Sequence, residues 1–237
     1  MKLLILGGTA EARKLAEKLG PRAVLSLAGA TRNPLATPQR SGGFGGVAGL
    51  KNYLSQQAIS TIIDATHPFA AQMSHNAATA AAGLGLPLLR LERAAWPESP
   101  DWINAETLPE AALRLPAAAR VFLSVGGQSI APFLARPDIW TLVRSIEPPA
   151  HFPRHGDVLL QRPPFTKAGE IDLMRRHAIT HLVSKNAGGQ ATIAKLAAAA
   201  ALGLQVIMVK RPHLPPVLTV ESVAEAVKWI AQQKGII

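Results

Sequence analysis

A glycine pair that follows an apolar run early in the chain has the composition of a phosphate-binding turn. Gly7, Gly8 and Thr9 follow the run KLLIL and precede a segment with helical periodicity. Glycine lets the backbone approach a ligand closely, and a helix N-terminus offers unpaired N–H groups and a partial positive charge. Thr9 is suited to be the N-cap, with Glu11 in the first turn. A capped turn without a ligand is the alternative, because the charge of Glu11 would repel a pyrophosphate on the helix axis.

The end of the second apolar run bears on which dinucleotide such a turn could bind. Enzymes that use NAD usually place an acidic residue there for the ribose hydroxyls. The stretch SLAGATRN has no carboxylate but contains Arg32. An arginine can form paired hydrogen bonds with a 2′-phosphate. If a dinucleotide binds, these residues favour NADPH over NADH; a solvated loop arginine is the alternative.

Two further stretches contain candidate ligand contacts. RSGGFGG, residues 40–46, carries Arg40 but lacks the order of a nucleoside-triphosphate loop. It is interpreted as a flexible loop or as a loop that closes over a cofactor, with Gly43 in its backbone and Phe44 as an apolar lid.

DATHPFA, residues 64–70, follows the run STIID, and such strand ends line the clefts of parallel sheets. Asp64 and His67 could transfer protons. The structural alternative is favoured: Asp64 or Thr66 ties down the loop, and a proline follows His67. We include Thr66 and His67 among the expected cofactor contacts.

The stretch SKNAGGQATIAKL, residues 184–196, repeats the order of strand, glycine pair and helix. It is interpreted as the second-domain counterpart of the first turn. Lys185 and Asn186 would point into a cleft, where they can bind carboxylates or phosphates beside Gly188 and Gly189. A second capped turn without a ligand is the alternative.

The elements that must position these residues alternate along the chain. Short apolar runs followed by amphipathic segments predict parallel sheets with helices on both faces. Residues 29–49 are expected to form a long loop, with a short helix near 50–57. Residues 95–109 contain three prolines and two tryptophans and mark a domain boundary. We therefore expect two Rossmann-like α/β domains, residues 1–98 and 99–237, with an active-site cleft between them.

Composition excludes several function classes. The net charge of +10 would attract polyanions, yet Lys and Arg are scattered and only 5% of residues are aromatic, which argues against nucleic acid as a partner. No apolar run approaches the about 20 residues of a membrane helix, so no membrane association is expected. The sequence has no cysteine, as is common in cytoplasmic proteins. His151 and His155 lack a third ligand, and no metal is expected.

Several stretches together resemble the precorrin-6A reductase family of cobalamin biosynthesis. They are ILGGTAEARKLA, RSGGFGG, IDATHPFAAQMS, LRLERAAW, and SKNAGGQATIAKL followed by VIMVKRP, and they run in family order across nearly the whole chain. DATHPFA is the most specific of them. Gly127 is a departure, because the family often carries an arginine at that position.

The resemblance implies a two-domain enzyme that uses NADPH to reduce one double bond of precorrin-6A, a ring-contracted tetrapyrrole, giving precorrin-6B. A cytoplasmic location is expected from the absence of cysteine. Residues 1–98 would bind NADPH, and residues 99–237 would complete the substrate cleft. Glu11 belongs to the family's opening motif and therefore does not argue against the cofactor. The expected substrate contacts are Arg40, Lys185, Asn186, Gly188 and Gly189.

Three alternatives stay open. The cobalt-containing analogue of precorrin-6A is the nearest competing substrate. A non-catalytic NADPH sensor and a basic nucleic-acid-binding protein are the rivals from other classes. The sequence does not identify the proton donor, and other enzymes of the corrin pathway are candidate partners.

Overall fold

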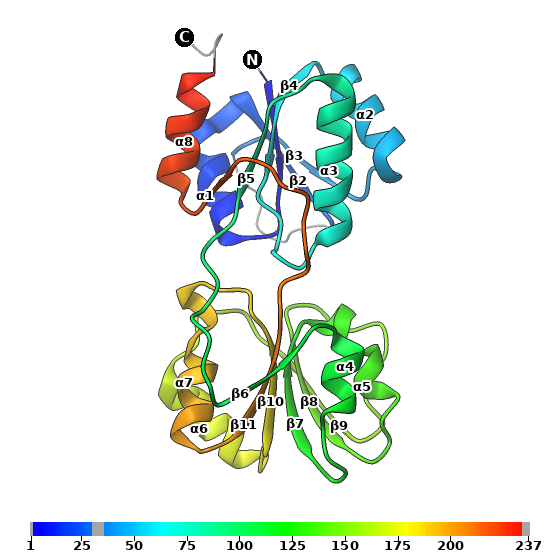
Figure 1. The fold of residues 1–237 in the computed structure, drawn as a ribbon, viewed down its shortest axis with the longest axis vertical. Coiled ribbons are helices and arrows are strands. Elements are labelled where there is room, and N and C mark those ends of the chain that lie inside the picture. Colours follow the sequence, from blue (N-terminus) through cyan, green and yellow to red (C-terminus); the bar gives the residue numbers. More distant parts are fainter. Residues whose placement is uncertain (1, 30–35, 234–237) are drawn as a thin grey trace. The chain divides into compact units, whose positions relative to one another are not determined.

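The computed structural model describes residues 2–29 and 36–233, which form two α/β units (Figure 1). One unit comprises residues 1–94 and 212–237, and the other comprises residues 95–211. The first crossing between units lies close to the expected boundary. The expected assignment of residues 212–237 to the second domain is wrong, because this segment returns to the first unit.

The first unit is built on a six-stranded sheet whose strand pairs are all parallel. Helices α1 (Ala10–Leu19) and α8 (Val223–Gln232) cover one face, and α2 (Gly46–Gln56) and α3 (Ala71–Leu84) cover the other (Figure 1). The sheet order is β12 (Thr219–Val220), β5 (Leu88–Leu91), β4 (Ile59–Asp64), β1 (Lys2–Leu6), β2 (Ala23–Leu27) and β3 (Gln39–Ser41).

Successive side chains of β1 contribute to the hydrophobic cores on opposite faces of the sheet. Leu3 and Ile5 pack with the buried side chains of α1 and α8, whereas Leu4 and Leu6 pack with those of α2 and α3. Successive side chains of a strand point to opposite faces, so a continuous apolar run is what a sheet covered on both faces requires.

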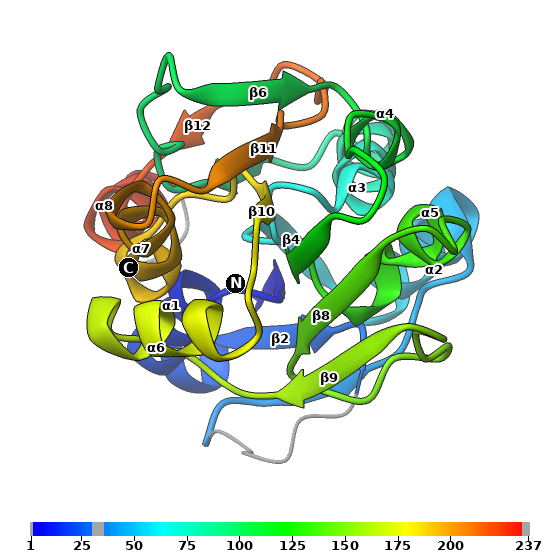
Figure 2. The same cartoon turned by 90° about the horizontal axis from the view of Figure 1, so that it is seen from below.

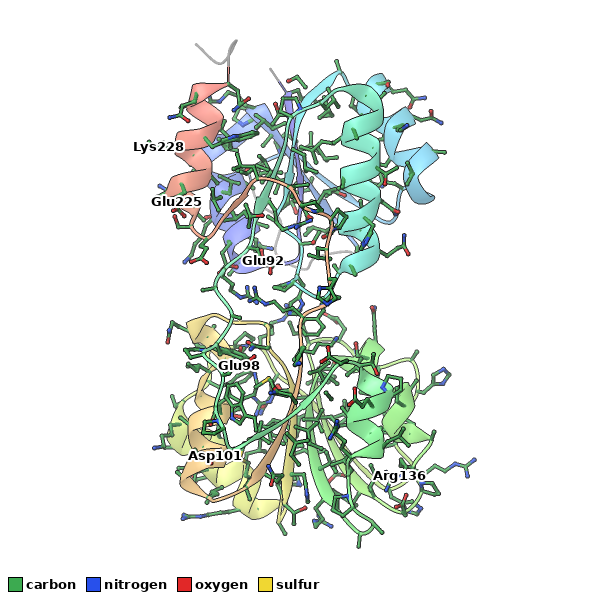
Figure 3. All side chains as sticks on the ribbon, in the orientation of Figure 1. Glu92, Glu98, Asp101, Arg136, Glu225 and Lys228 are labelled. Atoms are coloured by element: carbon green, nitrogen blue, oxygen red, sulfur yellow. The ribbon has the colours of Figure 1, made fainter. Side chains whose placement is uncertain are left out.

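The C-terminal helix shows why the last segment belongs to the first unit. Ala226 and Ile230 are buried in the same core as the apolar face of α1. Glu225 and Lys228 lie on the outer side of α8, where both are exposed (Figure 3). Ser222 caps the helix in a reciprocal pair of contacts with Glu225. An amphipathic helix of this kind needs one apolar surface to cover, and α1 supplies it.

The second unit repeats the architecture. Helices α4 (Leu108–Leu113) and α5 (Ala131–Leu134) lie on one face of its parallel sheet, with α6 (Lys167–Arg176) and α7 (Ala194–Ala201) on the other (Figure 2). The sheet order is β6 (Trp102–Ala105), β11 (Gln205–Val209), β10 (His181–Lys185), β7 (Arg120–Ser124), β8 (Trp140–Ser145) and β9 (Gly156–Leu160).

The two sheets share one strand order, which changes how the glycine turns correspond. The order β3-β2-β1-β4-β5 of the first unit matches β9-β8-β7-β10-β11 of the second. Strand β10 therefore occupies the place of β4, and the stretch SKNAGG corresponds to DATHPFA. The counterpart of Gly7 and Gly8 is the pair Gly126 and Gly127 after β7, so the expected equivalence of SKNAGG with the first turn is wrong.

Several short elements were not expected from the sequence. Strand β3 and the first turns of α2 lie within the predicted loop 29–49, and β6, α4 and β12 were also missed. Strand β3 has three polar residues, QRS, and β12 has two residues, so neither carries a periodic apolar signal. Over the described part of the chain, no helix is both long enough and apolar enough to span a bilayer.

Candidate functional site

The glycine turn lies at the switch point of the first unit, where the strand order reverses between β1 and β4. The N–H of Gly7 donates to the carbonyl of Ser26 at 2.8 Å, and a Cβ at Gly7 would lie 2.8 Å from Leu25 Cδ1. Gly8 has a φ of 136°, which L side chains rarely adopt. The backbone conformation at Gly8 therefore favours glycine, and a larger residue at Gly7 would have to displace the buried side chain of Leu25.

Thr9 joins the two loops that meet at this switch point. Its Oγ1 accepts a hydrogen bond from the N–H of Ala12 at 3.1 Å, as expected for the N-cap of α1. The same hydroxyl donates to the carbonyl of Ala65 at 2.8 Å. Ala65 follows β4 directly, so one side chain fixes the glycine turn against the DATHPFA loop.

Glu11 is paired with an arginine that sequence reasoning did not select. Arg93 Nη1 donates to Glu11 Oε2 at 2.9 Å, and both side chains are partly exposed. Arg93 follows β5, in the stretch LRLERAAW. Its positive charge offsets the carboxylate in the first turn of α1, which removes much of the repulsion that an anionic ligand would meet there.

Asp64 braces the DATHPFA loop from within the unit. Its Oδ1 accepts hydrogen bonds from the N–H of Thr66 at 3.2 Å and from the Thr66 hydroxyl at 2.7 Å. Its Oδ2 lies 3.5 Å from Nε of Arg90, and both side chains are buried. These contacts are those of the structural alternative, in which Asp64 and Thr66 tie down the loop.

A backbone hydrogen bond to Nδ1 sets the orientation of the His67 ring. The N–H of Phe69 donates to Nδ1 of His67 at 3.2 Å, so a neutral ring carries its proton on Nε2. His67 lines a small pocket of the first unit together with Asp64, Thr66, Pro68, Ser74, Arg90, Glu92 and Leu214. With Nδ1 accepting from Phe69, a neutral His67 ring presents its Nε2–H as a hydrogen-bond donor.

Arg40 lies in the first unit beside the glycine turn. Its Nη1 donates to Ser26 Oγ at 2.7 Å and to the carbonyl of Gly42 at 2.9 Å, and its Nη2 donates to the carbonyl of Gly43 at 3.0 Å. The guanidinium carbon lies 3.9 Å from the centre of the Phe44 ring. Phe44 packs against Arg40 and Tyr53, and a closure of this loop over a coenzyme stays a prediction.

Arg32, the expected contact for a 2′-phosphate, falls at 30–35, outside the residues that the structure describes. Of the expected cofactor contacts, Gly7, Gly8, Thr9, Glu11, Thr66 and His67 are brought together at one switch point. Gly43 lies nearer to the end of β3, where its carbonyl is bound by Arg40.

The switch point of the second unit brings Lys185 to the turn after β7. Lys185 Nζ donates to Ser129 Oγ at 2.7 Å, which connects the end of β10 with the turn of Gly126 and Gly127. Desolvation by burial lowers the pKa of the Lys185 ammonium from its usual range. A half-buried cation at a strand end can bind a carboxylate strongly, since little water competes with it.

Asn186 uses its side chain differently from the expectation. Its Oδ1 accepts from the N–H of Trp96 at 2.9 Å, and its Nδ2 donates to the carbonyl of Trp96 at 3.1 Å. The Trp96 indole Nε1 donates to the carbonyl of Gly189 at 2.9 Å. Gly188 and Gly189 both have positive φ angles, 69° and 85°. The loop thus holds the segment that enters the second unit, and no contact in it identifies a ligand.

No candidate metal site is found among the described residues. Across residues 2–29 and 36–233, no three His, Asp or Glu side chains are grouped closely enough to hold an ion.

Comparison with known proteins gives a consistent set of matches. A family model described as precorrin-6x reductase CbiJ/CobK matches residues 2–231. A relative from Rhodococcus erythropolis, named precorrin-6A reductase, is 47% identical over 240 residues that cover 97% of each chain. A solved structure described as CobK precorrin-6A reductase is 44% identical, covers 99% of this chain and 98% of that chain, and has a TM-score of 0.90. A relative from Priestia megaterium, named cobalt-precorrin-6A reductase, is 27% identical and covers 90% of this chain and 91% of its own.

Proposed function

The chain belongs to the precorrin-6x reductase family, and on that premise we propose that it uses NADPH to reduce one double bond of precorrin-6A, giving precorrin-6B. Membership makes it an oxidoreductase of cobalamin biosynthesis. A reductase of this family points to a nicotinamide cofactor, and NADPH is our choice among them. The metal-free substrate is favoured because the relative named for it is 47% identical, against 27% for the relative named for the cobalt form.

The observation that carries the cofactor assignment is the construction of the first switch point. Gly7, Gly8 and Thr9 close β1 onto α1, and Thr9 ties this turn to the loop after β4. A Cβ placed at Gly8 would find only the N–H of His67 within 4 Å among the described residues, at 3.8 Å. A turn with open space beside a glycine and an adjacent helix N-terminus fits a pyrophosphate.

In this proposal, residues of the first unit bind the coenzyme and orient it. The N–H groups of Gly8 and Thr9 would hold the pyrophosphate, since the N–H of Gly7 is bonded to Ser26, and Arg93 would keep Glu11 neutralised beside it. Thr66 and His67, on the loop after β4, would line the coenzyme site, and the Nε2–H of a neutral His67 ring would be the donor offered there. The bound coenzyme supplies the hydride, and the protein fixes the orientation of the two reacting rings.

Substrate binding is assigned to the second unit. Precorrin-6A carries acetate and propionate carboxylates, and Lys185 offers a half-buried ammonium at the end of β10 to bind them. The backbone N–H groups of Gly188 and Gly189 would extend this contact along the same loop, whereas both backbone groups of Asn186 are bonded within the protein. The net charge of +10 would steer the polyacidic substrate toward the protein. A cytoplasmic location and contacts with other enzymes of the corrin pathway stay predictions from the sequence.

The proposal is tested by offering the purified protein NADPH with precorrin-6A or with its cobalt form. Oxidation of NADPH that requires the metal-free macrocycle, with a product two mass units heavier, is the expected result. If only the cobalt form is turned over, cobalt-precorrin-6A would be assigned as the substrate instead. Binding of NADPH without turnover of either macrocycle would favour the non-catalytic sensor instead.

A further inference from the structure

Arg40 lies on β3, next to the end of β2, and the end of the second strand is where dinucleotide-binding folds recognise the adenosine ribose. It pairs with Ser26 in the register of β2 and β3, and the carbonyl of Ser26 accepts the N–H of Gly7. In folds with this strand order, the end of the second strand contacts the ribose that carries the 2′-group. Arg40 is therefore separated from the phosphate-binding turn after β1 by one strand, β2, and lies on the β2 side of the switch point.

The guanidinium of Arg40 is fixed before any ligand arrives. Three hydrogen bonds hold its Nη atoms to Ser26, Gly42 and Gly43, and the ring of Phe44 covers one face at 3.9 Å. A guanidinium has five N–H donors, and three of them are used in these bonds. Nε–H and one Nη2–H therefore stay available to a ligand, as far as the described residues show.

The charge of Arg40 is not neutralised by an acidic residue in the described ranges, in contrast to two other arginines of the unit. Arg93 pairs with Glu11, and Arg90 pairs with Asp64. The partners of Arg40 are a hydroxyl, two carbonyls and aromatic faces. An oriented cation without a counter-ion, beside a phosphate-binding turn, is suited to a phosphate dianion.

We infer that Arg40 binds the 2′-phosphate of the dinucleotide and sets the preference for NADPH over NADH. This role replaces the substrate contact expected for Arg40 from the sequence, and it rests on the proposed use of NADPH. Ser26 acts as a positioning residue, because its hydroxyl orients the guanidinium. A carboxylate at position 26 would instead neutralise Arg40 and offer acceptors to the ribose hydroxyls, as acidic residues do in enzymes that use NAD.

The test compares dissociation constants for NADPH and NADH, measured by coenzyme fluorescence in the full-length protein without tetrapyrrole. Arg40→Met keeps an apolar stem over Phe44 but removes the charge. The dissociation constant for NADPH is expected to rise by about 10-fold to 100-fold, and that for NADH by less than about twofold. Ser26→Asp, which retains Arg40, is expected to lower the NADPH-to-NADH affinity ratio by a similar factor.

Arg120→Met is the matched control. Arg120 also stacks on an aromatic ring, with 3.9 Å from its guanidinium carbon to the Trp140 ring centre, and its Nε donates to the carbonyl of His177 at 2.7 Å. It lies in the second unit, so its loss is expected to leave both affinities unchanged. Melting temperatures of all variants establish that they are folded under the conditions of the assay.

Equal weakening of NADPH and NADH by Arg40→Met would mean that Arg40 only braces its loop, and would overturn the inference. The same follows if Arg32→Ala abolishes the preference while Arg40→Met preserves it. A wild-type protein that binds both coenzymes equally would overturn the proposed use of NADPH together with this role. The two failures are therefore distinguishable, because the first two arise only in a protein that prefers NADPH.

Discussion

The side-chain amide of Asn186 pairs with both backbone groups of Trp96, accepting from its N–H at 2.9 Å and donating to its carbonyl at 3.1 Å. Arg211 donates to the backbone carbonyls of Asn186 and Ala187 at 2.9 and 3.2 Å. Trp96 lies where the chain enters the second unit, and Arg211 is the last residue before the chain leaves it. One loop therefore anchors both connecting segments.

Replacing Asn186 with Asp should loosen this anchor. Asp keeps an acceptor for the N–H of Trp96 but sets a carboxylate oxygen against its carbonyl, where Asn186 had donated a hydrogen bond. We expect a loss of about 1–3 kcal/mol in unfolding free energy and faster amide exchange at Ala95 and Trp96. Urea unfolding and hydrogen exchange measure the two effects.

Asn76→Asp is the control for that variant. Asn76 accepts a hydrogen bond from Gln72 at 3.0 Å on the exposed side of α3, and Asp retains this acceptor. Its unfolding free energy should stay within about 0.5 kcal/mol of wild type. If Asn186→Asp is equally mild, the anchor contributes little.

The ion pair between Glu11 and Arg93 should affect how tightly NADPH binds at the start of α1. Arg93→Met leaves the carboxylate of Glu11 without its partner beside the proposed pyrophosphate, so NADPH should bind several-fold more weakly. Adding Glu11→Gln should restore part of this loss, because the unbalanced charge is removed. Coenzyme titrations of both single variants and the double variant measure the coupling. Strictly additive losses would show that the two residues act independently.

Lys185 should make substrate binding depend on pH. Burial lowers the pKa of its ammonium, so the charge that attracts carboxylates is lost at a lower pH than for an ordinary lysine. The KM for the tetrapyrrole should therefore rise as pH increases through that lowered pKa, with NADPH affinity unchanged. In Lys185→Arg the rise should move to higher pH, because arginine stays charged.

Lys210→Arg is a control of the same chemistry on an exposed lysine that pairs with Glu106. It should leave the profile of KM against pH unaltered. A loss confined to NADPH affinity in Lys185→Ala would move Lys185 to the cofactor site.

His181 should contribute to loss of stability in acid. Desolvation lowers the pKa of its imidazole in the folded protein. The unfolded chain consequently takes up a proton first, so stability is present above the ordinary pKa of about 6.5 and declines as pH falls through the folded value. In His181→Gln, the decline in melting temperature between about pH 7.5 and 5 should be smaller. His151→Gln, at an exposed loop position, should decline as wild type does.

Local features of the chain could be predicted because their causes lie within a few residues. Thr9 caps α1, and Ala12, Leu15, Ala16 and Leu19 form its buried face, as their spacing indicates. The α/β class follows from alternating apolar runs and amphipathic segments. The family could be named from ordered motifs, since DATHPFA and the opening glycine turn are contiguous stretches.

The sequence therefore determined the strand–turn–helix units, the family and the glycine turn that closes β1. Only the tertiary structure decided the strand order, and with it the correspondence of SKNAGG with DATHPFA. It also brought Arg93 to Glu11 and Arg40 to Ser26, and it returned α8 to α1. The physical reason is that capping and periodicity depend on neighbouring residues, whereas pairing between distant strands depends on how whole apolar faces are buried together.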